Sequence, residues 1–291
     1  GGDNSQKGKL IANGVTFTAS DTSKKWEGIN FHDGAVDAMT FSGAIIEYAL
    51  QPIKIHEGWS GTIKNNIIRN SISGIFGNDK FNAGKGFKTR ITGNTFERLS
   101  EEALNFNVND VDSLFYENTY TKIGINHVNL RGEHMDMISH TYDWLDDGLP
   151  YRIGNLYVFE RNGSLNDDHH AATLQLYPGV RLEFNENRPL AVGGDNSQKG
   201  KLIANGVTFT ASDASKKWLG INFREGSVIL ASTILNSTVE HADHGLDGSN
   251  WNTMPLHIKR STFRYNNTGI IYRNTQDVGS QLPPITIGGS D

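Results

Sequence analysis

The sequence predicts an all-β fold built as a stacked solenoid, and three observations support this prediction. The first is a near-verbatim repeat: residues 1–31 return as residues 193–223, and only Thr22/Ala214 and Glu27/Leu219 differ. The second is a succession of short runs rich in Val, Ile, Thr, Phe and Tyr. The third is that Asn and Gly recur at the ends of these runs, where their access to left-handed backbone conformations suits tight corners. Because internal repeats define an architecture, the solenoid is the leading expectation.

Each expected strand is a short β-rich run bounded by Gly, Asn, Asp or Pro. In chain order, these runs are residues 10–18, 28–31, 44–48, 62–69, 90–96, 114–120, 127–130, 155–159, 173–177, 181–184, 190–192, 201–210, 220–223, 237–241, 257–263, 269–272 and 284–287. Amphipathic helical patterns are nearly absent, and only residues 100–104 indicate a helical turn.

Other all-β folds share part of this pattern. Asn13-Gly14 and Asn205-Gly206 are strong hairpin signals, so an antiparallel sandwich stays open as an alternative. A propeller would show a period of about 40 to 45 residues with blade signatures. The sequence has neither, so a propeller is disfavoured.

The duplication continues beyond the opening phrase with lower identity. Residues 46–49 match 239–242, and residues 63–70 match 258–265. The offset between the copies grows from 192 to 195, as small loop insertions would produce.

A series of phrases at residues 172–184, 190–193, 200–210 and 218–223 resembles the rungs of secreted bacterial right-handed parallel β-helix proteins, the pectate-lyase-like superfamily. Residues 65–70, followed by Gly74-Ile75, resemble the repeat of that family. The resemblance covers most of residues 1–99 and 150–287, while residues 100–149 match loosely. It implies a right-handed parallel β-helix, a single-stranded β-solenoid with loop insertions, in an extracellular or cell-surface protein of bacterial-type secretion. It carries no activity, because one scaffold can host many functions.

On this basis, residues 1–291 are expected to form one continuous β-helix. The first repeat block spans residues 1–99, divergent middle rungs with a loop insertion span 100–192, and the second block spans 193–291.

Composition narrows the class of protein. The net charge of −5 provides no basic footprint for nucleic acid. The chain has no cysteine, which rules out disulfides and thiolate metal sites. No apolar run reaches the length of a membrane span, and no signal peptide pattern is present. No cofactor is expected.

The two ends of the sequence suggest assembly. Residues 285–291 read like the lead-in at residues 190–195, and Gly1-Gly2-Asp3 is what should follow such a lead-in. Neither end carries an amphipathic cap, which solenoids usually need. We therefore expect end-to-end association with another copy, or flanking repeats of a longer chain. The candidate assembly residues are Leu10, Val15, Phe17, Ile285 and Ile287, of which the first three should face the core.

The five tryptophans are the candidates for carbohydrate contact. Trp26 and Trp218 lie at equivalent places in Lys-Lys-Trp-x-Gly-Ile-Asn-Phe, and the favoured interpretation is that each closes a corner over the core. Trp59, Trp144 and Trp251 lie in Gly-, Asp- or Asn-rich segments, which makes them better candidates for stacking on sugar rings.

Other clusters have weaker claims to chemistry. Residues 167–170, Asp-Asp-His-His, are expected to be a solvated turn, because adjacent strand residues point to opposite faces. His241 and His244 have a spacing that would suit a pair of metal ligands. Their counterparts in the first copy, Tyr48 and Gln51, could not serve as such a pair. The acidic set of Glu133, Asp136, Asp143, Asp146 and Asp147 could suit a glycosidase or calcium, although its spacing matches no calcium loop.

The sequence therefore favours an extracellular structural or adhesive β-helix segment. The alternative is a polysaccharide-binding module, and the third hypothesis is a polysaccharide lyase or hydrolase. Arg69 and Arg264 repeat with their rungs, which indicates a role at a corner rather than in a substrate site.

Overall fold

The computed structural model describes residues 8–32, 39–56, 61–78, 90–112, 114–135, 140–159, 171–194, 198–224, 232–248, 256–271 and 285–288. All strand pairings among them are parallel. Their one helical element is a 3-10 turn, Val108–Asp110. The predicted all-β parallel solenoid is confirmed, and the antiparallel alternative is wrong.

The contacts divide the chain into two compact units, and each is described by itself. Unit 1 comprises Gly1–Arg131 and Asp146–Pro150. Its first sheet has the order β1 (Ile11–Asn13), β4 (Met39–Ser42), β7 (Gly61–Lys64), β10 (Arg90–Thr92), β13 (Phe115–Tyr116). Its second sheet has the order β2 (Thr16–Phe17), β5 (Ile45–Glu47), β8 (Ile67–Arg69), β11 (Thr95–Glu102), β14 (Thr119–Ile125). A third row contains β3 (Ile29–Phe31), β6 (Ile53–His56), β9 (Ile75–Asn78), β12 (Leu104–Asn107), β15 (Val128–Arg131).

Unit 2 comprises Gly132–Leu145 and Tyr151–Asp291. Its first sheet has the order β17 (Thr141–Trp144), β20 (Ala172–Leu176), β23 (Gly200–Asn205), β26 (Ser232–Leu235), β29 (Leu256–Lys259), β32 (Ile285–Gly288). A second row contains β18 (Tyr151–Ile153), β21 (Arg181–Phe184), β24 (Thr208–Ala211), β27 (Thr238–Glu240), β30 (Thr262–Arg264). Its third sheet has the order β16 (His134–Met135), β19 (Leu156–Val158), β22 (Pro189–Val192), β25 (Gly220–Phe223), β28 (His244–Asp247), β31 (Thr268–Ile271).

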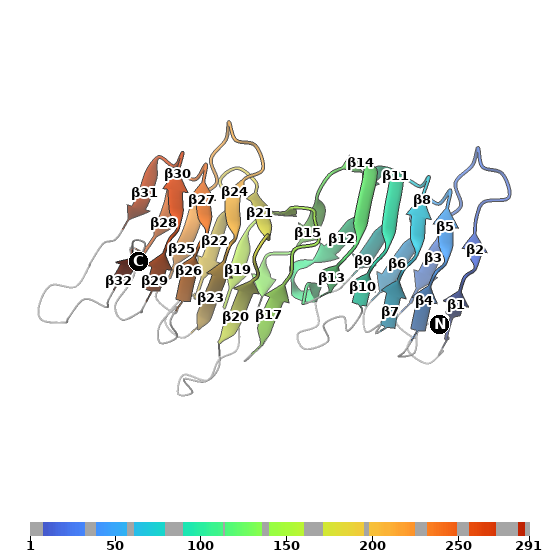
Figure 1. Cartoon of the computed structure of the whole chain (residues 1–291), viewed down its shortest axis with the longest axis horizontal. Helices are drawn as coiled ribbons and strands as arrows, with labels where there is room; N and C mark the ends of the chain where they lie inside the picture. Colours follow the sequence, from blue (N-terminus) through green and yellow to red (C-terminus); the bar gives the residue numbers. More distant parts are fainter. Residues whose placement is uncertain are drawn as a thin grey trace, which may run out of the picture. The chain divides into compact units, whose positions relative to one another are not determined.

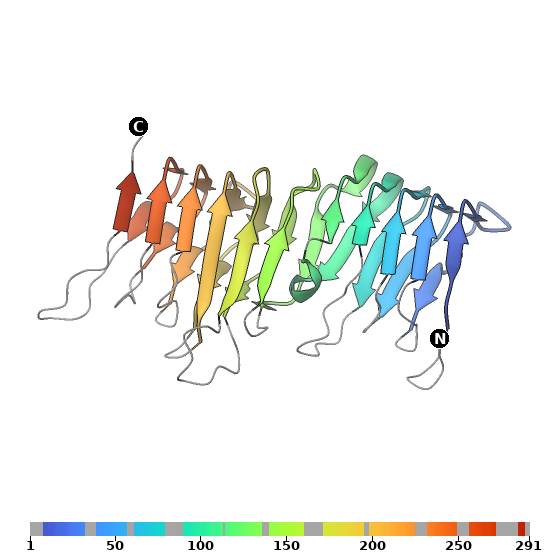
Figure 2. The same ribbon diagram turned by 60° about the horizontal axis from the view of Figure 1, so that its bottom comes forward.

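Three successive strands of the chain, one in each sheet, form what we call a rung, and rungs stack within each unit (Figure 1). The turned view shows neighbouring strands of one sheet running in the same direction (Figure 2). Asn13-Gly14 and Asn205-Gly206 mark corners that lead to the next sheet, from β1 to β2 and from β23 to β24, rather than hairpins.

Two local predictions are wrong. Residues 100–104 form no helical turn, because β11 runs through Glu102 and β12 begins at Leu104. The final strand is also not equivalent to the lead-in at residues 190–195. Pro189–Val192 lies in the third sheet of unit 2, whereas Ile285–Gly288 pairs with Leu256–Lys259 in the first sheet.

Inward side chains form ladders along the stack, and these ladders make the core. In the first sheet of unit 1, the parallel register aligns Ala12, Phe41, Ile63, Ile91 and Phe115. All five are buried. Removing apolar area from water is the main stabilising term in such a core.

A buried asparagine ladder holds the corner between the first two sheets of unit 1. The Nδ2 of Asn66 donates to Phe41 O (3.2 Å) and to Oδ1 of Asn94 (2.9 Å). Asn94 Nδ2 donates to Ile63 O (2.9 Å) and to Oδ1 of Asn118 (3.0 Å). Each asparagine therefore satisfies backbone groups of its neighbours as well as the next member of the ladder.

The ladder ends on the carboxylate of Asp147. This carboxylate accepts hydrogen bonds from the backbone N of Asn118 (3.0 Å), from Asn118 Nδ2 (2.8 Å) and from the Tyr120 hydroxyl. Burial raises the pKa of the Asp147 carboxyl above its ordinary range, and the hydrogen bonds from Tyr120 and Asn118 oppose that shift. Asp147 is thus a structural end to the ladder.

A tight corner explains the conserved spacing of Trp-x-Gly in the two copies. Gly28 and Gly220 have φ of 104° and 98°. A Cβ at Gly28 would lie 1.8 Å from Gln51 O, and one at Gly220 would lie 1.6 Å from His244 O. The next turn of the backbone occupies the space a side chain would need, so only glycine fits.

Candidate functional site

The first rung, β1 to β3, has a free edge: among the described residues no strand pairs with its outer side. Ile11 on β1 is 58% exposed, and Val15 at the following corner is 43% exposed. Leu10 and Phe17 are half-buried. Apolar side chains and unpaired strand edges together are a typical site of strand addition.

The second copy of the same phrase forms the matching rung, β23 to β25, and its environment is different. Val207, the counterpart of Val15, is 1% exposed. Leu202 and Phe209, the counterparts of Leu10 and Phe17, are fully buried. Since the local sequence is identical, the difference arises from what lies over each rung.

The element that lies over the matching rung is the covering rung, β20 to β22. Its three strands pair in parallel with β23, β24 and β25 respectively. Between strands, Thr208 N donates to Val180 O (3.0 Å), and Gly179 N donates to Gly206 O (3.0 Å). A Cβ at Gly206 would meet Pro178 at 3.2 Å, whereas a Cβ at Gly14 would have no neighbour within 4 Å.

Trp26 and Trp218 close corners, as the sequence predicted. Trp26 Nε1 donates to Glu47 O (2.9 Å), and Trp218 Nε1 donates to Glu240 O (2.9 Å). Each residue also makes a parallel bridge, to Ala49 and to Ala242. Trp218 is fully buried and Trp26 is half-buried. Burial removes Trp218 from the candidates for sugar stacking.

The prediction that Trp144 lies in a loop and contacts sugar is wrong. It lies on β17 rather than in a loop, and its ring is fully buried against Tyr151 with centroids 5.3 Å apart. It cannot stack on an external sugar. Trp59 and Trp251 lie outside the described residues, as do the side chains of Ile285 and Ile287, whose backbone forms part of β32.

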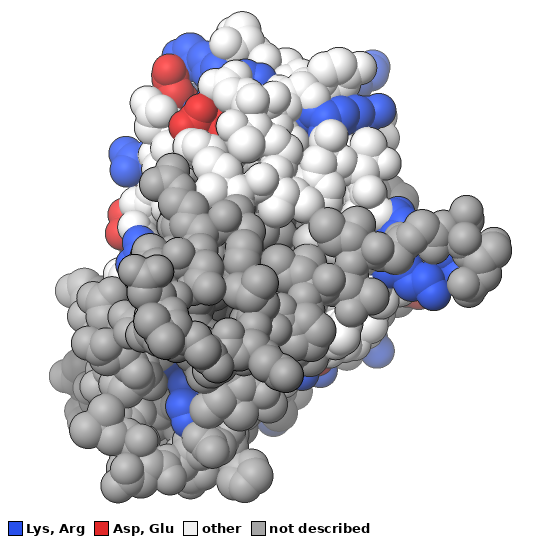
Figure 3. All heavy atoms as spheres, turned by 90° about the vertical axis from the view of Figure 1, so that its left-hand side faces the viewer, with Lys and Arg blue, Asp and Glu red and all other residues white. Residues whose placement is uncertain are grey.

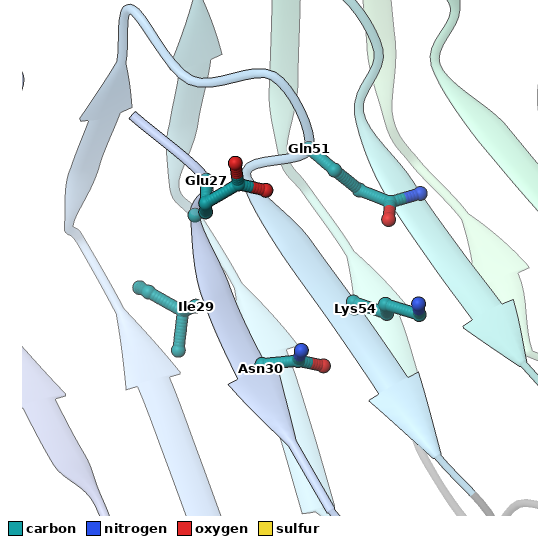
Figure 4. A pocket seen from close by; sticks show the side chains of 6 residues that line it. Glu27, Ile29, Asn30, Gln51 and Lys54 are labelled. Carbon is teal, nitrogen blue, oxygen red and sulfur yellow. The ribbon is translucent and has the colours of Figure 1, made fainter. Parts of the chain in front are cut away.

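A small hollow lies beside β3. It has a volume of about 110 Å³ and is lined by Glu27, Gly28, Ile29, Asn30, Gln51 and Lys54. Figure 4 shows Glu27 and Gln51 at one end and Asn30 and Lys54 at the other. The hollow is smaller than the roughly 300 Å³ at which small-molecule sites begin. In the second copy, Leu219, His244 and Asp247 replace its Glu27, Gln51 and Lys54.

Exposed aromatic rings do not gather on one face of the described residues. The large aromatic side chains exposed there are Tyr177, after β20, and Tyr265, after β30. Phe76 on β9 is half-buried between two cations: Lys54 Nζ lies 5.9 Å and the Arg131 guanidinium carbon 4.2 Å from its ring centroid. The Arg131 Nε also donates to Asn105 Oδ1 (2.7 Å), so this cluster is largely tied within the sheet.

The acidic residues singled out from the sequence have local partners wherever the structure describes them. Asp143 accepts from the Tyr177 hydroxyl (3.1 Å), Asp146 accepts from the backbone N of Gly148 (2.9 Å), and Asp147 ends the asparagine ladder. Glu133 accepts from Asn155 Nδ2 (3.1 Å). Asp136 lies outside the described residues. Each described carboxylate therefore has a local structural partner.

The histidine clusters also do not form a metal site in the part of the chain that is described. His241 stacks on Tyr265 (5.2 Å), and His244 Nδ1 lies 3.3 Å from an Asp243 carboxylate oxygen. Residues 167–170 lie outside the described residues. No described helix is long and apolar enough to cross a membrane.

The repeated arginines act at corners, as predicted. Arg69 Nε donates to a Glu47 carboxylate oxygen (2.8 Å), and Arg264 Nε donates to the equivalent oxygen of Glu240 (2.8 Å). The ion pair with Glu47 raises the pKa of Arg69 further. The repeat thus carries its own corner ion pair.

Sequence reasoning did not find the asparagine ladder or its end at Asp147. The signal was present, because Asn66, Asn94 and Asn118 each precede a strand by the same short distance. Asp147 could not be added to that series, because its segment belongs to unit 1 although the flanking residues belong to unit 2.

The chain was compared with protein families, curated proteins and solved structures. No protein family profile matches it, and neither curated proteins nor solved structures match it.

Proposed function

We propose that this chain is a structural β-solenoid segment that works by joining further solenoid rungs at its free edge. The observation that carries the proposal is the contrast between Val15, 43% exposed, and Val207, 1% exposed, within one duplicated phrase. A side chain that the repeat buries in one copy is left open in the other. An extracellular or cell-surface setting with an adhesive role is part of the proposal, and it rests on the resemblance of residues 172–223 to secreted β-helix rungs.

Unit 2 supports the same function at its last described rung. Phe263 on β30 is half-buried, whereas Val239, its neighbour in the β27–β30 pairing, is fully buried. Ile270 and Ile271 on β31 are also half-buried. Viewed from the side of β30 and β31, the described surface carries basic and acidic residues among uncharged ones (Figure 3). Open apolar side chains on an unpaired strand edge suit association by strand pairing.

The test is association of the whole chain. Electron microscopy and light scattering at increasing protein concentration should show end-to-end particles, and Val15→Asp should reduce them because it places a charge in the apolar edge. Leu219→Glu is the matched control. It removes an exposed apolar side chain from the matching rung and installs the residue that the first copy carries there. Strictly monomeric particles at every concentration would count against the proposal.

Polysaccharide binding is the second candidate function, and one observation favours it. Phe76 lies in a register row with Asn30 and Lys54, which provides a ring, a cation and an amide on one face. Rings and amides of this kind recognise sugars by stacking and hydrogen bonding. A glycan array probed with the chain and with Phe76→Ala tests this candidate. Binding that depends on Phe76 would support it, and the absence of bound glycan would oppose it.

A further inference from the structure

We propose that the partner of the free edge is a solenoid rung with the pattern of residues 172–192, aligned on β1, β2 and β3 as the covering rung is aligned on β23, β24 and β25. This inference rests on the proposed function and adds the identity and register of the docked surface. The chain contains the first-rung phrase twice, at residues 1–31 and 193–223, and in the second copy the covering rung shows what packs on that phrase.

The first sheet sets one part of the register. In unit 2, Leu174 pairs with Leu202 and Leu176 pairs with Ala204. Their counterparts in the first rung are Leu10 and Ala12. The partner therefore presents leucine-like side chains opposite Leu10 and Ala12, on a strand parallel to β1. This arrangement places a continuous apolar ladder on top of Ala12 and Phe41.

The second sheet supplies the aromatic anchor. Leu182 pairs with Phe209, whose counterpart is Phe17. Phe184 stacks on Trp218, with centroids 4.4 Å apart and an interplanar angle of 8°. Trp26 takes the place of Trp218 in the first rung and is half-buried. A phenylalanine of the partner is the group that would complete this stack.

The corner after the second sheet adds polar complementarity. Asn187 N donates to Lys217 O (2.9 Å), Leu219 N donates to Arg188 O (3.1 Å), and Lys216 pairs with Glu186 (3.1 Å). In the first rung, Lys25, Glu27 and Lys24 take the places of Lys217, Leu219 and Lys216 respectively. Glu27 in place of Leu219 adds a carboxylate next to the position that Arg188 holds. Lys24 and Glu27 of the first rung could therefore pair with an acidic and a basic side chain at the partner's corner.

The third sheet completes the pairing. Leu190 pairs with Ile221, and Val192 pairs with Phe223. In the first rung, the counterparts of Ile221 and Phe223 are Ile29 and Phe31. Val192 is followed directly by Gly193, which corresponds to Gly1. A rung placed before Gly1 would therefore join the first rung through the same sequence that joins the covering rung to the matching rung.

This continuity gives a direct experiment on the full chain. Residues 171–192 are fused in front of Gly1, and Val15→Cys supplies one thiol in a chain that has no cysteine. The rate of thiol labelling is compared with that of Val15→Cys without the fusion. We expect at least tenfold slower labelling in the fused chain. A second fusion, in which the added segment carries Leu182→Asp and Phe184→Asp, is the control and should label at the unfused rate. Circular dichroism checks that each variant is folded.

The outcomes separate this inference from the proposed function. Protection by the intact fusion, but not by the substituted one, supports the inference even where the unfused chain stays monomeric, a result that would count against the proposed function alone. Labelling at the unfused rate in the intact, folded fusion overturns the inference, even where the chain associates. In that case the occupant is a different surface, such as the β30–β32 edge of a second copy.

Discussion

Trp218 stacks on Phe184 of the preceding rung, with ring centroids 4.4 Å apart and nearly parallel planes. Trp26 lies in a phrase that differs from that of Trp218 only at Thr22/Ala214 and Glu27/Leu219, and it makes the same Nε1 hydrogen bond to a carbonyl of the next rung. It differs in its burial, since Trp218 is fully buried and Trp26 is half-buried. The chain therefore contains an internal control for what a covering rung contributes.

This pair gives the first prediction. Trp218→Ala should lower the free energy of unfolding by about 3 to 5 kcal/mol, because it leaves a cavity under Phe184. Trp26→Ala should cost less than half as much, because part of its ring is already in water. Denaturant unfolding of both variants provides the measurement. Equal losses would show that the covering rung adds little at this corner.

The second prediction concerns the close approach at Gly28. Gly28→Ala should destabilise the fold by about 3 kcal/mol or more, because its Cβ would lie 1.8 Å from Gln51 O. Gly14→Ala is the matched control, since Gly14 also has a positive φ but has open space around it. Its cost should be about 1 to 2 kcal/mol, which is the strain of a left-handed backbone alone. Thermal melts of the two variants test the difference, and a Gly14 variant as unstable as the Gly28 variant would contradict it.

The third prediction concerns the asparagine ladder. Asn94→Ala removes the acceptor of Asn66 Nδ2 and the donors to Ile63 O and Asn118 Oδ1. Leaving such buried groups without partners should cost about 3 kcal/mol in total. Asn126→Ala, at an exposed position, should change stability by less than about 0.5 kcal/mol. Urea unfolding compares the two, and a mild effect at Asn94 would mean that water replaces the ladder.

The fourth prediction concerns pH. Burial raises the pKa of Asp147 in the folded state, so the folded protein holds this proton at pH values where the unfolded chain has released it. The stability that Asp147 contributes is fully present below the ordinary aspartate pKa and is lost as pH rises through the raised value. The unfolding free energy of the natural chain, measured relative to that of Asp147→Asn, should therefore fall as pH rises through that window. A difference that stays constant across the window would contradict the raised pKa.

Much of the fold could be predicted from the sequence, and the reasons are local. The duplicated phrase, the short β-rich runs and the Asn or Gly corners together indicated a solenoid, and the corner roles of Trp26, Trp218 and Arg69 followed from their repetition. The Asn-Gly pairs misled in one respect, because a left-handed corner between two sheets has the same sequence signature as a hairpin. Residues 100–104 misled because inward packing of Leu99 and Leu104 overrides a weak helical preference.

The candidate site was predicted only in part. The sequence marked Leu10, Val15 and Phe17 as core-facing assembly residues, but it could not show that the nearly identical phrase at residues 193–223 is covered. That distinction depends on pairing with β20 to β22, which no local pattern encodes. Trp144 misled for a related reason: acidic neighbours indicated a loop, whereas β17 turns the ring into the core.

The most direct test of the account is thiol accessibility at the two copies of one valine. Val15→Cys and Val207→Cys each place a single thiol in the same local sequence. Under dilute conditions, in which the chain is monomeric, we expect the thiol at position 15 to react rapidly and the thiol at position 207 to react only as fast as the protein unfolds. Equal labelling rates at the two positions would contradict the claim that the first rung presents an open edge that the second copy keeps covered.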